Sequence, residues 1–343
     1  MSTTTTNKLP VDIITGFLGS GKTTLLGNIL KEGGFEDASV IINEYGLAGL
    51  DHRLIRRINE RTTLLAGGCV CCNRREDLIL ELNDMLNACQ SGELSLDRVI
   101  VETTGLANPA PMLFSILTHP ALMHHYFIET VVVCLDCVNG EAHIRDNQES
   151  VKQIAAADKV IITKTDIGTP EMADNLRVSV ARINPTAVIL EAADGIAPRS
   201  IFTPAPVSGL PWRQTPAPQA KPGKPEHTSG VRNIAIQFDE PLDWLAFGIW
   251  LSMLLHKHGE KMLRVKGIVD VGEKGPIAIN GVQHIIHPPT HLDDWRGYET
   301  RNSQIVFIMR DIEPERIMDS LMAFQRLIGA HPEIQEINMN PLA

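Results

Sequence analysis

The residues with the clearest chemical meaning form a phosphate loop, G-x-x-x-x-G-K-[ST], at Gly16-Phe17-Leu18-Gly19-Ser20-Gly21-Lys22-Thr23. The loop follows an apolar run at 11–14 and precedes a helical pattern, which is the strand–loop–helix context that this motif requires. Its glycines allow backbone N–H groups to surround phosphate oxygens, and the helix N-terminus adds a partial positive charge. The residues expected to hold the phosphates of a nucleotide are Gly19, Ser20, Gly21, Lys22, Thr23 and Thr24. Lys22 is expected to reach the β and γ phosphates, and the Thr23 hydroxyl to ligate magnesium.

A second group places three thiols, Cys69, Cys71 and Cys72, within four residues of a chain that has 6 cysteines. In extended backbone, Cys69 and Cys71 share one face and Cys72 points to the other, so the first two are the natural ligand pair. Cys72 joins them only if the chain turns there, which the preceding glycines and Asn73 favour. Thiolates so placed suit zinc, copper(I) or cobalt, and three sulfurs leave a tetrahedral site one ligand short. A redox dithiol and inert packing are the alternatives. Cys89, Cys134 and Cys137 lie in apolar patterns and are expected to be structural thiols.

Two later segments carry the remaining candidates for a nucleotide site. Glu102 ends an apolar run and begins Glu-Thr-Thr-Gly-Leu-Ala, so a carboxylate stands beside a glycine that can follow the γ-phosphate. Its expected role is to hold water or magnesium. The apolar run 160–162 leads into Thr163-Lys164-Thr165-Asp166. This spacing places the Asp166 carboxylate where GTPases hold the N1 and N2 hydrogens of guanine, a donor pair that adenine lacks. The expected nucleotide is therefore GTP, contacted by Lys164 and Asp166.

The elements that must position these residues follow a regular alternation. Short apolar runs at 40–42, 98–101, 130–133, 160–162 and 187–190 alternate with helical patterns near 75–90, 109–118, 147–157 and 171–183. Such alternation predicts a mainly parallel sheet covered on both faces by helices. We therefore expect an α/β P-loop NTPase domain over residues 1–202.

The remainder of the chain predicts a linker and a second domain. Residues 203–230 contain seven prolines with Gln, Lys, Gly and Ser, a composition that cannot build a core. After this Pro-rich linker, strand candidates lie at 231–238, 263–271, 276–286 and 304–309, and helical stretches at 243–258 and 313–327. This order predicts a smaller α+β carboxyl-terminal domain over 231–343.

Composition limits the classes of partner. The net charge of −10, from 31 basic and 41 acidic residues, disfavours nucleic acid and anionic membrane surfaces. The first residues lack the apolar segment of a signal peptide, and no run approaches the roughly 20 apolar residues of a membrane helix. Clustered cysteines fit a reducing compartment better than a disulfide framework. A cytoplasmic protein is expected.

Taken together, these motifs resemble the CobW/YjiA-type GTPases, which belong with the urease and hydrogenase accessory proteins to the metal-handling P-loop GTPases. The segments that carry the resemblance are Thr15–Thr24, Asn43-Glu44-Tyr45-Gly46, Asp51, Gly68–Cys72, Glu102–Ala107 and Thr163–Asp166. The resemblance implies slow GTP hydrolysis coupled to the binding and delivery of a divalent metal, most often zinc and in some members cobalt. It also implies a carboxyl-terminal domain that contains a βαβ sandwich.

The chain departs from this family pattern at three places. Thr163 stands where Asn is more usual, which removes the amide expected to brace the guanine loop and predicts modest nucleotide affinity. Leu47 stands where many relatives carry another acid, so the acids of that segment are a weaker basis for a metal site. The linker has one Glu226-His227 pair where several relatives have a histidine-rich stretch, so bulk metal storage is not expected.

The order of the motifs suggests a mechanism. Segments 43–52 and 102–107 are expected to act as switches at the γ-phosphate, with Asp51 or Glu102 positioning magnesium and the attacking water, and with Lys22 as the third catalytic group. The cysteines lie between the switches in sequence, so GTP hydrolysis would release the metal to a client protein. The alternatives are a GTP-binding adaptor with a structural metal site, a cobalt-handling protein linked to cobalamin or nitrile hydratase maturation, and an ATP-using kinase. The sequence does not define the oligomeric state, and a homodimer is one possibility.

Overall fold

The computed structural model describes residues 8–43, 62–64, 73–204, 230–296, 298, 301–327 and 334–337. Contacts divide the chain into two compact units. The first comprises Met1–His143, Ala157–Leu176 and Val188–Ala205. The second comprises Ile144–Ala156, Arg177–Ala187 and Pro206–Ala343.

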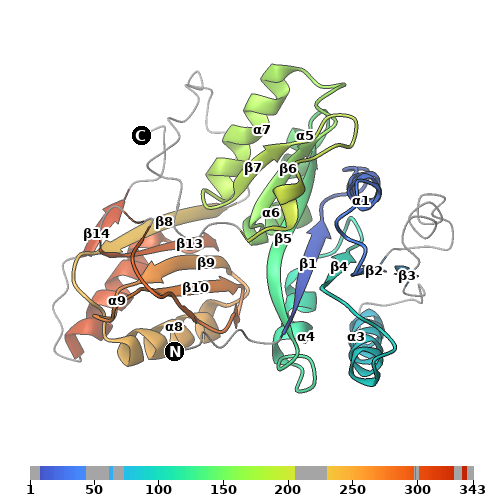
Figure 1. The fold of residues 1–343 in the computed structure, drawn as a ribbon. Helices are drawn as coiled ribbons and strands as arrows, with labels where there is room; N and C mark the ends of the chain where they lie inside the picture. Colours follow the sequence, from blue (N-terminus) through green and yellow to red (C-terminus); the bar gives the residue numbers. More distant parts are fainter. Residues whose placement is uncertain are drawn as a thin grey trace. The chain divides into compact units, whose positions relative to one another are not determined.

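The first unit is built on a 7-stranded sheet in the order β3-β2-β4-β1-β5-β6-β7, and every pairing in it is parallel. The strands are β1 (Leu9–Thr15), β2 (Ala38–Ile42), β3 (Thr62–Leu64), β4 (Arg98–Glu102), β5 (Tyr126–Asp136), β6 (Lys159–Thr163) and β7 (Val188–Glu191). The central strands are almost wholly buried, as expected for a parallel sheet covered on both faces. The predicted α/β P-loop fold is confirmed, and Figure 1 shows β1 beside β4 and β5.

The helices connect these strands in the predicted alternation. They are α1 (Lys22–Lys31), α3 (Asn73–Ser91), α4 (Ala110–Thr118), α5 (Gly140–Asp146), α6 (Gln148–Ala156), α7 (Pro170–Ile183) and the 3-10 turn η1 (Arg199–Phe202). One core cluster joins α1, through Leu25, Leu26 and Ile29, to the buried side chains Ile201 and Phe202 of η1. Residues 201 and 202 therefore still belong to the hydrophobic core of the first unit.

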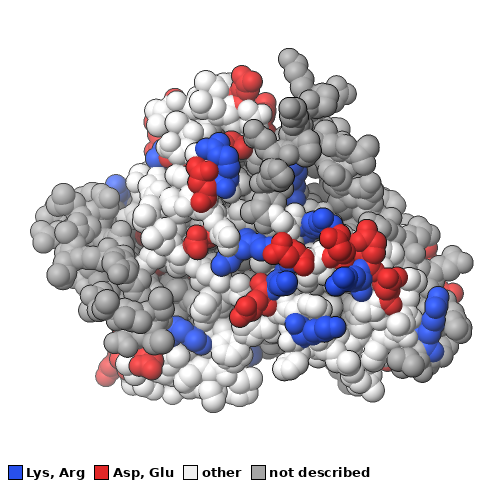
Figure 2. Space-filling view, turned by 180° about the vertical axis from the view of Figure 1, so that it is seen from behind, with Lys and Arg blue, Asp and Glu red and all other residues white. Residues whose placement is uncertain are grey.

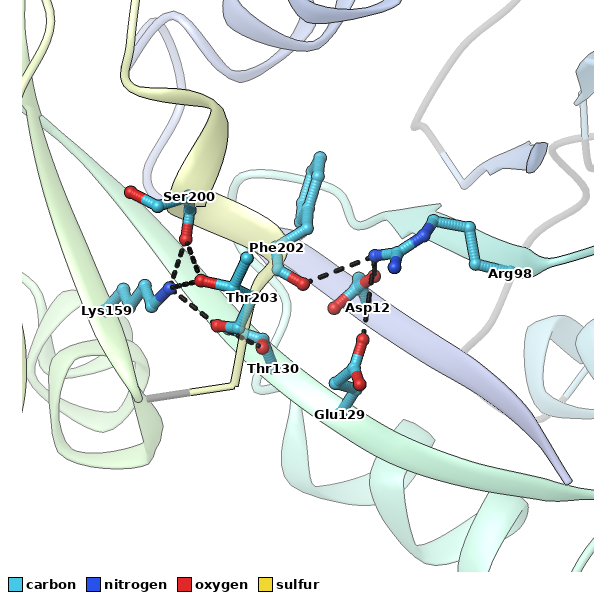
Figure 3. Close-up of polar contacts among 8 residues, drawn as sticks. All are labelled: Asp12, Arg98, Glu129, Thr130, Lys159, Ser200, Phe202 and Thr203. Atoms are coloured by element: carbon cyan, nitrogen blue, oxygen red, sulfur yellow. Dashed lines mark hydrogen bonds and ion pairs between the residues drawn. The ribbon is translucent and has the colours of Figure 1, made fainter. Parts of the chain in front are cut away.

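A polar cluster lies at the amino ends of the strands, and we call it the amino-end cluster (Figure 3). Arg98, the first residue of β4, pairs with Asp12 of β1 at 2.7 Å and lies 3.6 Å from Glu129 of β5. Asp12 is fully buried. Burial raises its pKa to about 7, although Arg98 acts in the opposite direction. Burial also raises the pKa of Glu129.

The same cluster holds the chain where it leaves the first unit (Figure 3). Lys159, the first residue of β6, donates through Nζ to the carbonyl oxygens of Ser200 and Thr203. Arg98 donates to the carbonyl oxygen of Phe202 at 3.2 Å, and Thr130 donates to that of Thr203 at 3.3 Å. Side chains from three strands thereby donate to the carbonyl groups of Ser200, Phe202 and Thr203 at the edge of the core.

The second unit contains an antiparallel sheet in the order β11-β10-β9-β13-β8-β14, with β12 paired to β10. Its strands are β8 (Val231–Phe238), β9 (Met262–Val269), β10 (Ile277–Val282), β11 (Ile285–Ile286), β12 (Thr290–His291), β13 (Ser303–Arg310) and β14 (Ile334–Ile337). Helices α8 (Trp244–His258) and α9 (Pro314–Leu327) pack apolar side chains into its core. The predicted α+β class is confirmed, and the sheet adds the short strands β12 and β14, which the sequence did not predict.

Acidic and basic side chains alternate on the face drawn in Figure 2. The described part of this face therefore shows no extended positive or negative patch. A nucleic-acid backbone is usually bound by an extended positive patch. Among the described helices, none combines the length and the apolar character needed to cross a lipid bilayer.

Candidate nucleotide site

The phosphate loop joins β1 to α1 at the carboxyl edge of the central strand. Gly16, Gly19 and Gly21 have positive φ angles of 138°, 74° and 84°, which side-chain-bearing residues rarely adopt. A Cβ on Gly16 would lie 2.2 Å from the carbonyl oxygen of Cys134, so this glycine also permits close approach to β5. The loop therefore has the tight curl that a phosphate cradle requires.

Lys22 and Thr24 occupy the first turn of α1. The Lys22 ammonium group donates to the carbonyl oxygens of Gly16 at 2.8 Å and Phe17 at 3.1 Å, so the side chain folds back over the loop. This position puts its charge beside the space that the loop encloses. Thr24 is exposed on the same helix, and a Cβ on Gly195 would lie 3.1 Å from its methyl carbon.

Thr23 and Glu102 come together from α1 and the end of β4. The Thr23 hydroxyl donates to Glu102 Oε1 at 2.5 Å, and the Glu102 side chain is buried. Glu102 aligns with Ile14 in the register of β4 on β1, which places it directly beside the start of the phosphate loop. A hydroxyl and a carboxylate oxygen are ligands that magnesium accepts, so this pair fits the expected cation.

The loop after β4 lies against the phosphate loop. A Cβ on Gly105 would be 2.5 Å from the backbone nitrogen of Leu18, so only glycine permits this approach. Thr103 reinforces the contact between β4 and β1 by donating through its hydroxyl to Thr15 Oγ1 at 2.7 Å. The start of segment 102–107 is thus held against β1 and the phosphate loop by a close backbone approach and a hydrogen bond.

Thr163 ends β6 and contacts the phosphate loop directly. Its hydroxyl donates to the carbonyl oxygen of Ser20 at 2.7 Å, with Leu135 O as a longer second acceptor at 3.3 Å. Thr163 thus bonds the phosphate loop through its hydroxyl, and the modest nucleotide affinity expected from the missing amide stays a prediction.

Lys164 is held in an unusual backbone conformation. Its φ angle is 58°, and its ammonium group donates to Asp136 Oδ2 at 2.7 Å. Burial works to raise the pKa of Asp136, but hydrogen bonds from Lys164, from the Asn139 side chain and from the backbone of Val138 and Asn139 lower it overall. Asp136 is therefore an ionised anchor that fixes Lys164 beside the loop.

Asp166 contacts a loop that the sequence analysis did not include in the site. Its Oδ1 accepts the backbone N–H of Asp194 at 2.9 Å, and Thr165 donates to the carbonyl oxygen of Ala192 at 3.2 Å. From α1, Asn28 donates to the carbonyl oxygens of Asp194 and Gly195. The Asp-Gly pair after an apolar strand is a turn signal that could have identified this loop.

Several predicted residues lie outside the described residues: Asp51, Cys69, Cys71, Cys72 and the segment 44–50. Among the described residues, no group of three or more His, Cys, Asp and Glu side chains could hold a metal ion. Cys134 and Cys137 are buried, and burial raises the pKa of both thiols, to about 12 for Cys134. A raised pKa disfavours the thiolate that binds metals, so these two cysteines fit the predicted structural role.

The parallel sheet and its glycine-rich loop define a P-loop nucleotide-binding protein with a second, α+β unit. A model of the CobW/HypB/UreG nucleotide-binding domain matches residues 10–191, and a model of the cobalamin synthesis protein CobW C-terminal domain matches residues 231–325. The chain therefore belongs to the CobW/HypB/UreG family, as its motifs predicted.

Relatives with known names support this assignment. The zinc chaperone YjiA of Escherichia coli is 29% identical over 318 residues, which cover 91% of this chain and 97% of YjiA. The zinc-regulated GTPase metalloprotein activator 1 of Schizosaccharomyces pombe is 33% identical over 56% of this chain and 47% of its own length. A crystal structure of Zn(II)-bound YjiA GTPase from E. coli aligns with a TM-score of 0.67 and 25% identity, over 93% of this chain and 99% of that one. The predicted enzyme class, a P-loop GTPase, is confirmed.

Proposed function

We propose that this protein binds a divalent metal, with zinc as the cargo, and releases it to a client protein under the control of GTP hydrolysis. The observation that carries the proposal is the meeting of Thr23, Glu102 and Thr163 at the phosphate loop. The proposal assigns binding of the nucleotide to Gly19–Thr24 and to Lys164 and Asp166. It assigns the cargo to Cys69 and Cys71, with Cys72 as a third ligand if the chain turns there.

The hydrolytic step follows from the positions of the described groups. Lys22 would neutralise the β and γ phosphates, and Thr23 and Glu102 would hold magnesium or the attacking water. Magnesium, when bound, would supply positive charge against the charge that develops on the phosphates. Glu102 would orient the water in line with the γ-phosphate from the end of β4, and Asp51 is the second carboxylate proposed for this task.

The described elements on either side of the cysteine segment support control by the nucleotide. Leu64 ends β3, and β3 runs parallel to β2 and so to β1. The chain therefore enters segment 65–72 at the carboxyl edge of the sheet, the same edge as the phosphate loop, and leaves it at Asn73, where α3 begins. The zinc chaperones YjiA and CobW, which match more than nine-tenths of this chain, support zinc as the cargo.

The test is the zinc affinity of the purified protein, measured against a chromophoric chelator with GTP–magnesium bound and again with GDP–magnesium bound. A difference of about tenfold or more, equal to about 1.4 kcal/mol of coupling, is expected for a nucleotide-controlled carrier. Equal affinities would contradict the coupling and favour an adaptor with a structural metal site.

The cysteine assignment has its own matched variants. The Cys69→Ser/Cys71→Ser double variant should lose tight zinc binding and keep GDP binding. Cys89→Ser, which changes a half-buried thiol of α3 outside the motif, should retain both. Unfolding of the double variant with loss of GDP binding would instead show a structural site. A cobalt-handling role would appear as a tighter, nucleotide-dependent affinity for cobalt than for zinc, measured in the same way. A cytoplasmic location remains part of the proposal.

A further inference from the structure

We propose that the outer side of α8 is a self-association surface, through which two copies of this chain form a weak dimer about a twofold axis near Ile249. The inference goes beyond the proposed metal-delivery function and does not depend on it. It rests on a row of apolar side chains that α8 exposes to solvent, and on the charges at the two ends of that row.

Helix α8 is apolar on all sides over most of its length. The segment 244–255 contains no charged residue. Its inner side chains, among them Phe247, Trp250 and Leu254, pack into the core of the second unit beside the antiparallel sheet (Figure 1). A helix that is apolar on all sides is normally buried on all sides. The described residues cover only the inner side of α8, whereas its composition predicts cover on both.

Three large apolar side chains form a row on the outer side of this helix. Leu245, Ile249 and Met253 are 73%, 46% and 60% exposed. Their spacing of four residues places them next to one another along the helix surface. Ser252 lies beside the row, and its hydroxyl donates to the carbonyl oxygen of Gly248 at 2.7 Å, so burial of this serine would leave no donor unpaired. Single exposed apolar residues are normal, but a contiguous group marks a contact surface.

Helix α9 of the same unit shows the pattern expected of a helix that faces water. Its inner side chains Ile317 and Leu321 are buried, whereas Glu315, Arg316 and Asp319 are exposed. A charged outer side keeps such a helix in contact with solvent. The apolar outer side is thus a property of α8 that its neighbour in the core does not share.

Opposite charges flank the apolar row. The acidic end consists of the exposed residues Asp239, Glu240 and Asp243. The basic end consists of the exposed residues Lys257, Lys261 and Arg316, with one acid, Glu260, beside them. Burial lowers the pKa of His258, and the charges of these three bases lower it further, so they gather around the end of α8. The outer side of α8 therefore runs from a negative end, through an apolar middle, to a positive end.

This order of charges makes the surface complementary to itself. A twofold axis near Ile249 places the two copies of α8 antiparallel, so Leu245 of one copy faces Met253 of the other and each acidic end meets a basic end. A contact between identical patches requires such self-complementarity. A lipid surface fits less well, because membrane-bound helices carry Lys and Arg along a polar side, whereas the other side of α8 is packed in the core.

The size of the surface predicts a weak dimer. A standard interface uses about 20–30 residues on each side, and the row with its charged ends is smaller. We therefore expect a dissociation constant on the order of 10 µM. Sedimentation velocity over about 1–200 µM protein spans this value and measures the change from monomer to dimer.

The experiment compares the parent protein with Ile249→Glu and with a matched control, Leu80→Glu. Ile249→Glu would bring two carboxylates together at the axis, whereas Leu80 is an equally large apolar side chain, 61% exposed, on α3 of the first unit. The parent and Leu80→Glu should dimerise alike, and Ile249→Glu should raise the dissociation constant at least about tenfold. Thermal unfolding of the three proteins establishes that each variant is folded.

An exchange of charges tests the antiparallel arrangement. Glu240→Lys and Lys257→Glu each place like charges at the ends of the dimer, and each should weaken it by about threefold or more. The double variant exchanges the two charges and should restore the dissociation constant of the parent. Additive losses in the double variant would overturn the antiparallel pairing.

A parent protein that stays monomeric at the highest concentration would overturn the inference, and so would an Ile249→Glu variant that dimerises like the parent. A monomeric parent that binds vesicles of phosphatidylcholine and phosphatidylglycerol, with binding lost in Ile249→Glu, would assign the row to a lipid surface instead. A monomeric parent that Ile249→Glu destabilises and Leu80→Glu does not would show that another part of the same chain covers α8.

Discussion

The Thr23 hydroxyl and the Glu102 carboxylate form a 2.5 Å hydrogen bond between the first turn of α1 and the end of β4. Since the hydrogen of Thr23 points to Glu102, the lone pairs of its oxygen face other directions and remain able to ligate a cation. The carboxylate thus orients the proposed magnesium ligand, in addition to its proposed role toward water. Glu102 is for this reason the most informative single position of the site.

Glu102→Gln should lower kcat for GTP hydrolysis by at least about 100-fold, because the amide keeps the shape but loses the charge that would orient magnesium or water. Steady-state phosphate release and GDP titration provide the two measurements. Binding of GDP should remain within about threefold of the parent protein. Glu129→Gln is the control, since this carboxylate lies in the amino-end cluster; equal losses in both variants would argue against a role for Glu102 in hydrolysis.

Asp166→Asn should shift the preference from GTP toward XTP by at least about tenfold. Asparagine can still accept the N–H of Asp194, but toward the base it offers one acceptor and one donor, which matches the N1–H and the 2-oxo group of xanthine. Competition of GTP and XTP against a fluorescent guanine nucleotide measures the change. An Asp166→Asn variant that keeps the parent preference would remove Asp166 from the base site.

Asp12 should make stability fall as the pH rises from about 4 to about 7. The pKa of Asp12 is about 7 in the folded protein, whereas an ordinary Asp, as in the unfolded chain, has a pKa of 3.8. At pH values between these two, the folded protein therefore binds a proton that the unfolded chain does not. That contribution is complete below the unfolded pKa and is lost as the pH rises through the folded pKa, up to about 4 kcal/mol in all. Urea unfolding from about pH 5 to about pH 8 should therefore show a steeper decline for the parent than for Asp12→Asn. Parallel curves would contradict the raised pKa.

Substitution of two glycines of the second unit by alanine should change the stability of the protein in opposite directions. Gly248 lies inside α8 with no atom within 4 Å of an added Cβ, so Gly248→Ala should stabilise the protein by about 0.5–1 kcal/mol. In Gly267→Ala the Cβ would lie 2.2 Å from Gln304 O on the neighbouring strand β13, so this variant should lose stability. Thermal unfolding of both variants tests the pair, and a stabilised Gly267→Ala would show that the strands can separate to admit the methyl group.

The elements that could be predicted from the sequence are those marked by a pattern of a few neighbouring residues. The phosphate loop, the apolar strands and the boundaries of β8 at Val231 and Phe238 all agree with the structure, because alternation and glycine chemistry act over a few residues. Strand β3 has only three residues and α5 has seven, so neither offers enough periodicity to be recognised. Strand β14 gains its structure from pairing with β8, which is far away in sequence.

The contacts that the sequence did not predict depend on register between distant strands. Asp12 and Arg98 meet only because β1 and β4 pair in parallel, and no local pattern links the two residues. The hydrogen bond from Thr163 to Ser20 was not predicted, because the sequence does not show how near the phosphate loop comes to the end of β6. The sequence shows which side chains can form hydrogen bonds and ion pairs. Which partners lie close enough to each of them depends on how the strands pair in the sheet.

The amino-end cluster also bears on where the nucleotide-binding half of the chain ends as a folding unit. The family match stops at residue 191, but Ile201 and Phe202 are buried in the same core as α1, and the carbonyl groups of Ser200 and Thr203 receive the Lys159 ammonium group. A chain cut at 191 would lose this part of its core and the carbonyl groups that accept from Lys159. The match to the nucleotide-binding family therefore ends before the folding unit does. A fragment meant to fold as the GTPase half must extend beyond Thr203.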